Sequence, residues 1–247
     1  MPAISIVNQK GGTGKTTTTM NLGAALASLD KRVLIVDMDS QGNLGYSFGV
    51  DDGKTIADVL QGDADLDEVI QEREGVSIVP SDMRLVDIEL SLGDLENRHS
   101  IVLDKLSDDI ARFDYVFFDC PPSLSVLSIN ALYASEYVII PMLMEVLSLQ
   151  GLDQIIGSIS KINSAYEKDL KILGILPVMV DKRRKLTEEV RDHIRENYDV
   201  NIFDSYIRNN VKASESPSFG SSVIAYAPKS NSAVDYSAFA RELTALI

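Results

Sequence analysis

Residues 8–17 read NQKGGTGKTT and lie between an apolar run and a helix-like segment. Residues 3–7 (AISIV) have the length and composition of a buried strand, and residues 16–29 carry apolar side chains at helical spacing. Glycines adopt backbone angles that a side chain would forbid, so the N–H groups of this loop can point together at an anion. The stretch therefore predicts a phosphate-binding loop between a strand and a helix.

Two side chains of the loop have specific expected roles. Lys15 places a positive charge next to the phosphates, where the helix N-terminus adds its own partial charge, and Thr16 supplies a hydroxyl of the type that coordinates magnesium. A glycine-rich turn with a chance lysine is disfavoured, because strand, loop and helix occur in the order that the motif requires. The predicted nucleotide-binding set is Lys10, Gly11, Gly12, Thr13, Gly14, Lys15, Thr16 and Thr17.

The loop departs from the general P-loop pattern in two places. That pattern has a glycine five positions before Gly14, where this chain has Gln9, and a second lysine, Lys10, precedes the glycine pair. The form KGGTGKTT resembles the deviant Walker A motif of the ParA/MinD group of ATPases. The resemblance implies a dimer that sandwiches two ATP molecules, with Lys10 of each subunit reaching the ATP of the other.

Two further apolar runs end in carboxylates. Residues 32–37 continue into DMDSQGN, which contains Asp39, and residues 115–122 read YVFFDCPP, which contains Asp119. Because ligands bind at the carboxyl ends of the strands in open α/β sheets, we expect both aspartates to face the same crevice as Lys15. Such carboxylates can hold metal-bound water or orient the attacking water. The predicted magnesium site consists of Thr16, Asp39 and Asp119.

The rest of the chain alternates between strand-like and helix-like segments. Further strand-like runs occur at residues 76–80, 137–141 and 171–180, and the helix-like segments are residues 56–60, 66–70, 85–92, 101–111, 124–134, 148–162 and 186–197. Most of the strands are apolar on both faces, which predicts an α/β fold with a doubly wound, mostly parallel sheet and helices on both faces. No repeat or linker divides the chain, so we expect one domain over residues 1–247. Residues 51–114 carry 18 acidic and 6 basic residues and show no pattern of a site.

The resemblance to the ParA/MinD group covers essentially the whole chain. DMDSQGN matches the Walker A′ motif of the group, with Ser40 in place of the usual proline, and residues 119–132 (DCPPSLSVLSINAL) are similar to its switch segment. Residues 207–236 resemble the C-terminal stretch that helps to form the adenine pocket and a DNA-binding face. The catalytic set that the resemblance implies is Lys10, Lys15 and Asp39.

Composition is that of an ordinary globular protein, with 247 residues, 45% of them hydrophobic and 24% charged. The N-terminus runs directly into the first strand, and no apolar stretch approaches the ~20 residues of a membrane span, so we expect a cytoplasmic protein. The one cysteine, Cys120, excludes an intrachain disulfide and argues against the iron–sulfur branch of the superfamily. We expect Cys120 to be a small buried residue.

The net charge of −14 opposes binding to nucleic acid, because a polyanion repels an acidic protein. The charge is unevenly distributed: residues 1–170 carry 12 basic and 27 acidic residues, and residues 171–247 carry 11 and 10. Screening over about 8 Å makes local charge matter more than net charge, so a DNA-binding face is expected in the last third, although a solvated surface remains the alternative. By resemblance, Lys212 takes the place of a DNA-contacting arginine, whereas Asn231 stands where some members have another basic residue. The predicted DNA contacts are Lys212, Arg183, Arg184 and Arg208.

The resemblance implies a slow, magnesium-dependent ATPase that partitions plasmid or chromosomal DNA. Its ATP-bound homodimer would bind DNA without sequence preference and associate with the nucleoid, and a ParB-like centromere-binding or cargo adaptor protein would stimulate hydrolysis and release. Two alternatives stay open: the same mechanism acting on a protein cargo, such as a microcompartment or a chemoreceptor cluster, and a metabolic P-loop ligase of the dethiobiotin synthetase type. Membrane targeting of the MinD type is disfavoured, because the tail AFARELTALI is not a basic amphipathic extension.

Overall fold

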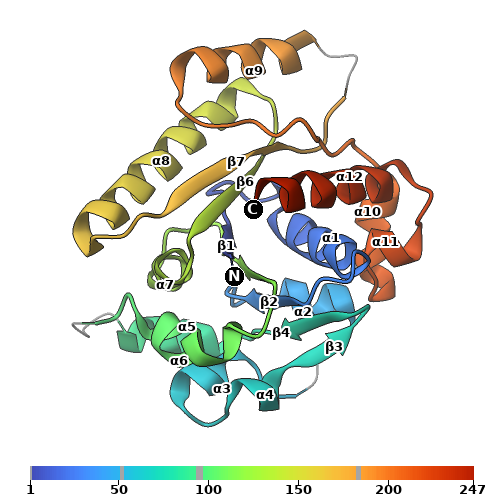
Figure 1. Cartoon of the computed structure of the whole chain (residues 1–247). Coiled ribbons are helices and arrows are strands. Elements are labelled where there is room, and N and C mark those ends of the chain that lie inside the picture. Colours follow the sequence, from blue (N-terminus) through green and yellow to red (C-terminus); the bar gives the residue numbers. More distant parts are fainter. Residues whose placement is uncertain (1, 51–52, 93–96, 182–184) are drawn as a thin grey trace.

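The computed structural model describes residues 2–50, 53–92, 97–181 and 185–247, in which strands and helices alternate along most of the chain (Figure 1). The strands are β1 (Ala3–Ile6), β2 (Val33–Asp37), β3 (Gln71–Arg73), β4 (Val76–Val79), β5 (Tyr115–Asp119), β6 (Tyr137–Met142) and β7 (Lys171–Pro177). The helices before β5 are α1 (Lys15–Ala27), α2 (Asn43–Phe48), α3 (Ile56–Gln61), α4 (Leu66–Val69), α5 (Arg84–Leu92) and α6 (Ile101–Ile110). Those after β5 are α7 (Val126–Ala134), α8 (Val146–Tyr166), α9 (Lys185–Asn197), α10 (Val211–Glu215), the 3-10 helix η1 (Ser216–Phe219), α11 (Val223–Tyr226) and α12 (Asn231–Leu246).

The described strands form one sheet of seven strands in the order β3-β4-β2-β5-β1-β6-β7. All neighbours pair in parallel except β3 and β4, which are antiparallel. The structure thus confirms the predicted fold class. The sequence did not predict β3, a polar strand of three residues that joins β4 through a two-residue turn. Both turn residues, Glu74 and Gly75, have positive φ angles (53° and 76°), as tight hairpins require.

Side chains that alternate along the buried strands build a separate core on each face of the sheet. In β2, Leu34 and Val36 belong to one core, and Val33 and Ile35 belong to the other. Helices α3 to α9 cover the first core, and α1, α2, α11 and α12 cover the second. Figure 1 shows α1 and α12 together on one side of the sheet and α7 and α8 on the other. This arrangement accounts for strands that are apolar on both faces.

The last helix, α12, packs along α1. Tyr236, Phe239 and Leu243 are almost completely buried in the core between them. Cys120 is also buried, at 2% exposure, as expected. Among the described residues, no helix combines the length and the apolar character that crossing a membrane requires.

Helix α2 lies against the main chain that follows it, which generates a prediction about Gly45. A Cβ atom at Gly45 would lie 2.7 Å from the carbonyl oxygen of Val50 and 3.1 Å from Cβ of Pro80, whereas a Cβ atom at Gly157 on α8 would meet nothing within 4 Å. We expect Gly45→Ala to lower the free energy of unfolding by about 1–3 kcal/mol. The matched control, Gly157→Ala, should raise it by up to about 1 kcal/mol. Urea denaturation measures both, and equal effects would contradict the close approach of α2.

Candidate functional site

The loop between β1 and α1 has the geometry of an anion cradle. Gly12 and Gly14 have φ angles of 73° and 75°, in the region that favours glycine. The main-chain carbonyl of Lys10 accepts hydrogen bonds from the Thr13 hydroxyl (3.2 Å) and from Nζ of Lys15 (3.5 Å). A Cβ atom at Gly11 or Gly12 would meet no atom within 4 Å, so the space in front of the loop is open.

The loop is anchored to the sheet behind it. Asn8 accepts a hydrogen bond from the main-chain N–H of Lys10 (3.0 Å) and donates its own amide to the carbonyl of Pro141 (2.7 Å) at the end of β6. Helix α1 begins at Lys15, after the left-handed Gly14, whose carbonyl accepts the N–H of Thr18 (2.8 Å). The first turn of α1 therefore points its free N–H groups toward the loop.

Two strand ends place buried carboxylates below this loop. Asp37 and Asp119 are opposite one another in the register of β2 and β5, and both are almost completely buried. The Thr19 hydroxyl donates to Oδ1 of Asp119 (3.1 Å), and Thr16, one turn earlier, also favours the charged form of this carboxylate. Asp119 is therefore bonded to the second turn of α1.

Burial sets the protonation of this group of side chains. It raises the pKa of Asp119 to about 6, against hydrogen bonds from Thr16 and Thr19 and the charge of Lys15, which act in the opposite direction. Burial and then the charge of Asp119 raise the pKa of Asp37 well above its usual range. Burial also lowers the pKa of Lys15, an effect that Asp119 and Asp39 oppose. Without a ligand, the site thus contains more negative charge than its surroundings stabilise.

A cleft of about 680 Å³ opens above these residues. Its walls come from the glycine loop, from the loop that follows β2, from α2 and from the segment after β5. Asp39 lies half-buried in this wall, and one of its carboxylate oxygens accepts the main-chain N–H of Gln41 (3.1 Å). The predicted residues that line the cleft are Gly11, Gly12, Gly14, Lys15, Thr16, Thr17 and Asp39.

The cleft also contains residues that the sequence analysis missed. Glu89 of α5 lines it, and its carboxylate accepts the N–H of Val126 at the start of α7 (3.0 Å). Tyr46 of α2 and Pro217 of η1 line it too. Glu89 belongs to the acidic region in which no site was predicted, because a lone glutamate in an amphipathic helix carries no signal of its own.

A smaller hollow of about 90 Å³ adjoins the glycine loop at Gly14 and Thr17. Val178 and Ile207 are apolar residues of its lining, and Arg208 and Asn209 are polar ones. This hollow lies in the C-terminal stretch that was expected to form part of a nucleotide pocket.

Comparison with known proteins identifies the family. Residues 1–172 match a family model described as an AAA domain. The chain is 39% identical to the chromosome partitioning protein ParA of Myxococcus xanthus over 97% of this chain and 87% of that protein. It is 37% identical to the sporulation initiation inhibitor protein Soj of Bacillus subtilis, over 98% of both chains. The chain belongs to the ParA/Soj family of P-loop ATPases.

A solved structure from Mycobacterium smegmatis shares the fold of this ParA/Soj family member. It is cobyrinic acid a,c-diamide synthase with bound ADP and magnesium, 32% identical, with a TM-score of 0.86 over 98% of this chain and 93% of that one. The similarity confirms the fold class that the sequence predicted.

The basic residues predicted to contact DNA have different surroundings. Arg208 makes a two-pronged ion pair with Asp235, with Nη2 2.6 Å from Oδ1 and Nε 2.9 Å from Oδ2. Nζ of Lys212 lies 2.8 Å from Oε2 of Glu215 and 5.5 Å from the centre of the Tyr226 ring. The Lys212 pair is solvent-exposed and weak, whereas Asp235 largely neutralises Arg208. The other two predicted contacts, Arg183 and Arg184, lie outside the described residues.

The raised pKa of Asp119 generates a pH-dependent prediction for the protein without nucleotide or metal. The folded pKa (about 6) is higher than the ordinary value of 3.8, so the folded state binds the proton more tightly. The resulting stabilisation is complete below pH 3.8 and is lost as the pH rises through 6. We expect Asp119→Asn to raise the free energy of unfolding at pH 8 by roughly 1–3 kcal/mol, and the difference to disappear near pH 4.

Asp114 provides a control of opposite sign. Its side chain is 35% exposed, and its hydrogen-bonded ion pair with Arg32 (2.7 Å) lowers its pKa to about 2. The stabilisation that this ion pair provides is complete above pH 3.8, the ordinary pKa of an aspartate, and is lost as the pH falls through 2. Asp114→Asn should therefore lower stability at pH 8. Denaturant titrations in EDTA at several pH values measure both variants, and an Asp119→Asn protein that is less stable than the parent at pH 8 would contradict the charge imbalance.

Proposed function

We propose that this chain is a ParA-type ATPase that binds Mg-ATP, dimerises on it and binds DNA without sequence preference. Hydrolysis, stimulated by a partner protein bound to the cargo, then releases the dimer, so that plasmid or chromosomal DNA is moved or spaced. One observation carries the proposal: a glycine loop with open space in front of it, Lys15 and Asp39 line one cleft. The buried Asp119 is bonded to Thr19 of α1, the helix that begins at this loop. The ParA and Soj names of its relatives support the cellular role.

The donor groups of the cleft fit a magnesium nucleotide. No cluster of three or more His, Cys, Asp or Glu side chains suited to a metal occurs in the part of the chain that the structure describes. Magnesium commonly takes only one or two protein ligands and completes its shell with phosphate oxygens and water. The hydroxyl of Thr16 with the carboxylates of Asp39 and Asp119 is such a minimal set. A bound ion would also offset the surplus negative charge of the buried carboxylates.

Each residue of the cleft then has a task in hydrolysis. The N–H groups between Gly11 and Lys15 and the first turn of α1 bind the phosphates, and Lys15 adds its charge. Asp119 fixes the hydroxyl of Thr16, and Asp39 orients or activates the attacking water. Magnesium, when bound, would neutralise charge that develops on the phosphate oxygens. The apolar hollow beside Gly14 receives the base.

Lys10 has the properties that an intersubunit contact needs. Its side chain is exposed at the rim of the glycine loop, whereas its main-chain carbonyl holds Thr13 and Lys15. The task of its side chain therefore lies outside the subunit that carries it. In the proposed dimer, the ammonium group of Lys10 contacts the phosphates bound to the partner subunit.

Two lysine variants separate nucleotide binding from dimerisation. Lys15→Ala should weaken Mg-ATP binding at least 100-fold, because it removes a charge next to the phosphates. Lys10→Ala should bind ATP within about threefold of the parent but stay monomeric. Calorimetry and light scattering with ATP and with ADP measure both variants. A folded Lys15→Ala protein with the parent's ATP affinity would overturn the P-loop assignment, and an ATP-dependent dimer of Lys10→Ala would overturn the intersubunit contact.

A salt titration tests DNA binding. We expect Asp39→Ala to hydrolyse ATP slowly and accumulate as a dimer, and this dimer to bind duplex DNA with a linear log–log salt dependence. Lys212→Glu in this background should reduce the slope by about one for each DNA phosphate that is no longer neutralised, and should leave ATP binding unchanged. Lys161→Glu makes the same charge change on α8 and serves as a control. Binding of Lys212→Glu with the control's slope would remove Lys212 from the interface.

A metabolic P-loop ligase is the second candidate function. The 32% identity to the cobyrinic acid a,c-diamide synthase of M. smegmatis favours it, because that protein's name is one of a metabolic enzyme. The two candidates differ in what accelerates ATP turnover. A ligase requires a small carboxylated substrate, whereas a partitioning ATPase responds to DNA and its partner protein.

A further inference from the structure

The turn between β4 and α5 lies against the loop that contains Asp39. Strands β2 and β4 pair in parallel, with Val36 opposite Val79, so the segments that follow them emerge side by side at the edge of the sheet. Ser81, which is 8% exposed, donates its hydroxyl to the main-chain carbonyl of Asp39. Ser81 also acts against the raised pKa of the buried Asp37 carboxylate nearby. Ser81 is thus bonded directly to the main chain of the Asp39 loop.

The main chains of the two segments also approach each other closely. Gly42 has a φ angle of 63°, and a Cβ atom there would lie 3.0 Å from the carbonyl oxygen of Ser81. The N–H of Gly42 donates to the carbonyl of Asp39 (3.1 Å), the oxygen that also accepts the Ser81 hydroxyl. Any displacement of Ser81 therefore changes the support of Asp39 directly.

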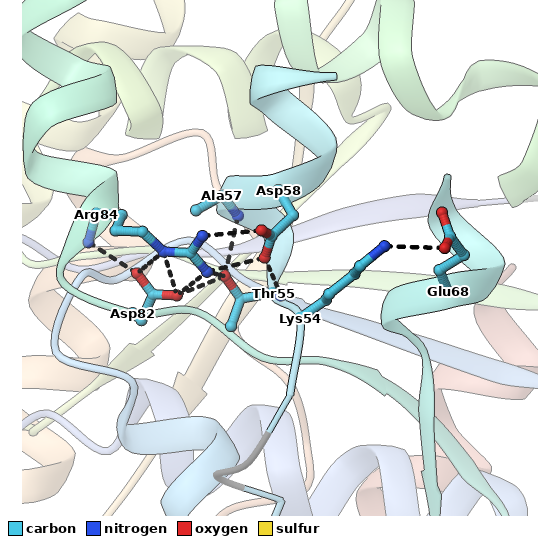
Figure 2. Close-up of polar contacts among 7 residues, drawn as sticks. All are labelled: Lys54, Thr55, Ala57, Asp58, Glu68, Asp82 and Arg84. Atoms are coloured by element: carbon cyan, nitrogen blue, oxygen red, sulfur yellow. Dashed lines mark hydrogen bonds and ion pairs between the residues drawn. The ribbon is translucent and has the colours of Figure 1, made fainter. Parts of the chain in front are cut away.

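Arg84 fixes the turn from the other side. Figure 2 shows its guanidinium between two carboxylates: Nη1 and Nη2 each lie 2.8 Å from an oxygen of Asp58 on α3, and Nη2 lies 2.7 Å from Oδ2 of Asp82 in the turn. Thr55 donates its hydroxyl to the same Oδ2 of Asp82 (2.7 Å). Arg84 is thereby locked to the turn and to the start of α3, a geometry for which a planar guanidinium is suited.

A main-chain bond completes the connection. The N–H of Ile56, the first residue of α3, donates to the carbonyl of Pro80 (2.9 Å). Thr55 and Asp58 form a capping box at this helix start, which makes the N-terminus of α3 a rigid support. The turn that carries Ser81 is thus bound to α3 on one side and to the Asp39 loop on the other.

We propose that Ser81 is a positioning residue for Asp39 and that Arg84 holds Ser81 in place. The inference rests on the proposed function, because it assigns the orientation of a carboxylate that acts on the attacking water. Ser81 fixes the carbonyl of Asp39, and the N–H of Gln41 fixes its side chain. The phosphates are bound elsewhere, by the glycine loop and Lys15. Removal of the Ser81 hydroxyl therefore slows hydrolysis and leaves ATP binding intact.

Steady-state kinetics of the full chain with Mg-ATP test Ser81. Ser81→Ala should reduce kcat about three- to tenfold, as expected for the removal of one hydrogen bond, with KM within twofold of the parent. Ser135→Ala is the control, because it also removes a buried hydroxyl that donates to a main-chain carbonyl, that of Ala131, and lies away from the cleft. This hydroxyl is also hydrogen-bonded to the hydroxyl of Ser5 (2.8 Å). Ser135→Ala should leave kcat unchanged.

Arg84 is tested with a neighbouring ion pair as control. Arg84→Gln should reduce kcat to the same extent as Ser81→Ala, and the double variant should be no slower than either, because both act through one contact. Lys54→Gln breaks the pair with Glu68, which Figure 2 shows beside the cluster, but leaves the turn untouched. It should have the parent's kcat.

Amide hydrogen exchange without nucleotide provides a readout that does not depend on catalysis. In Ser81→Ala the main-chain amides of Gln41 and Gly42, both bonded to Asp39, should exchange at least threefold faster than in the parent. The amides could exchange faster in Ser81→Ala although the parent protein hydrolyses no ATP under any condition. That result would show that Ser81 supports the Asp39 loop, but it would overturn the proposed function. An unchanged kcat in an active protein, a raised KM with an unchanged kcat, or unchanged exchange of both amides would each overturn the positioning role.

Discussion

The contact between Asp119 and the start of α1 is the constraint on which the site depends. A fully buried carboxylate is unfavourable unless hydrogen bonds or charges stabilise it. Here Thr16, Thr19 and Lys15 do so, and all three belong to the first two turns of one helix. Helix α1 is consequently held with its N-terminus at the carboxyl edge of the sheet, where the glycine loop has to be. Two of these side chains, Thr16 and Lys15, are also those that the proposed function assigns to the magnesium nucleotide.

This arrangement of buried carboxylates is electrostatically unbalanced by itself. Asp37 and Asp119 are neighbours at strand ends, and the pKa of each is raised, chiefly by burial. A ligand that brings a cation relieves this cost, so stability and ligand binding are coupled through the same carboxylates. The surrounding loops are bound to each other by neutral hydrogen bonds and by the exposed cluster around Arg84, which keep their geometry without adding charge to the cleft.

The many carboxylates of the chain also neutralise basic residues at its surface. Several of the described basic residues pair with carboxylates, among them Arg32, Arg84, Arg112 and Arg208. Such pairing lowers the positive charge that a polyanion encounters. The DNA-binding face that we propose would use, among the described residues, exposed lysines whose ion pairs are weak, as for Lys212, and a dimer would double that face.

The sequence alone determined the fold class, the glycine loop and the carboxylates at the strand ends, because these features are local. Apolar runs of strand length, helical spacing and the order of strand, loop and helix are all visible within short windows, and they brought Lys15, Asp39 and Asp119 to one edge of the sheet. The observed ends of the helices and strands differ from the predicted ends by a few residues. Strand β5, for example, ends at Asp119, before Pro121 and Pro122. Only the tertiary structure decided which distant residues join this edge. The positions of Glu89 and Ser81 and the pairs Arg208–Asp235 and Arg84–Asp58 depend on contacts between segments far apart in the chain. No local pattern encodes which distant carboxylate a given side chain will meet.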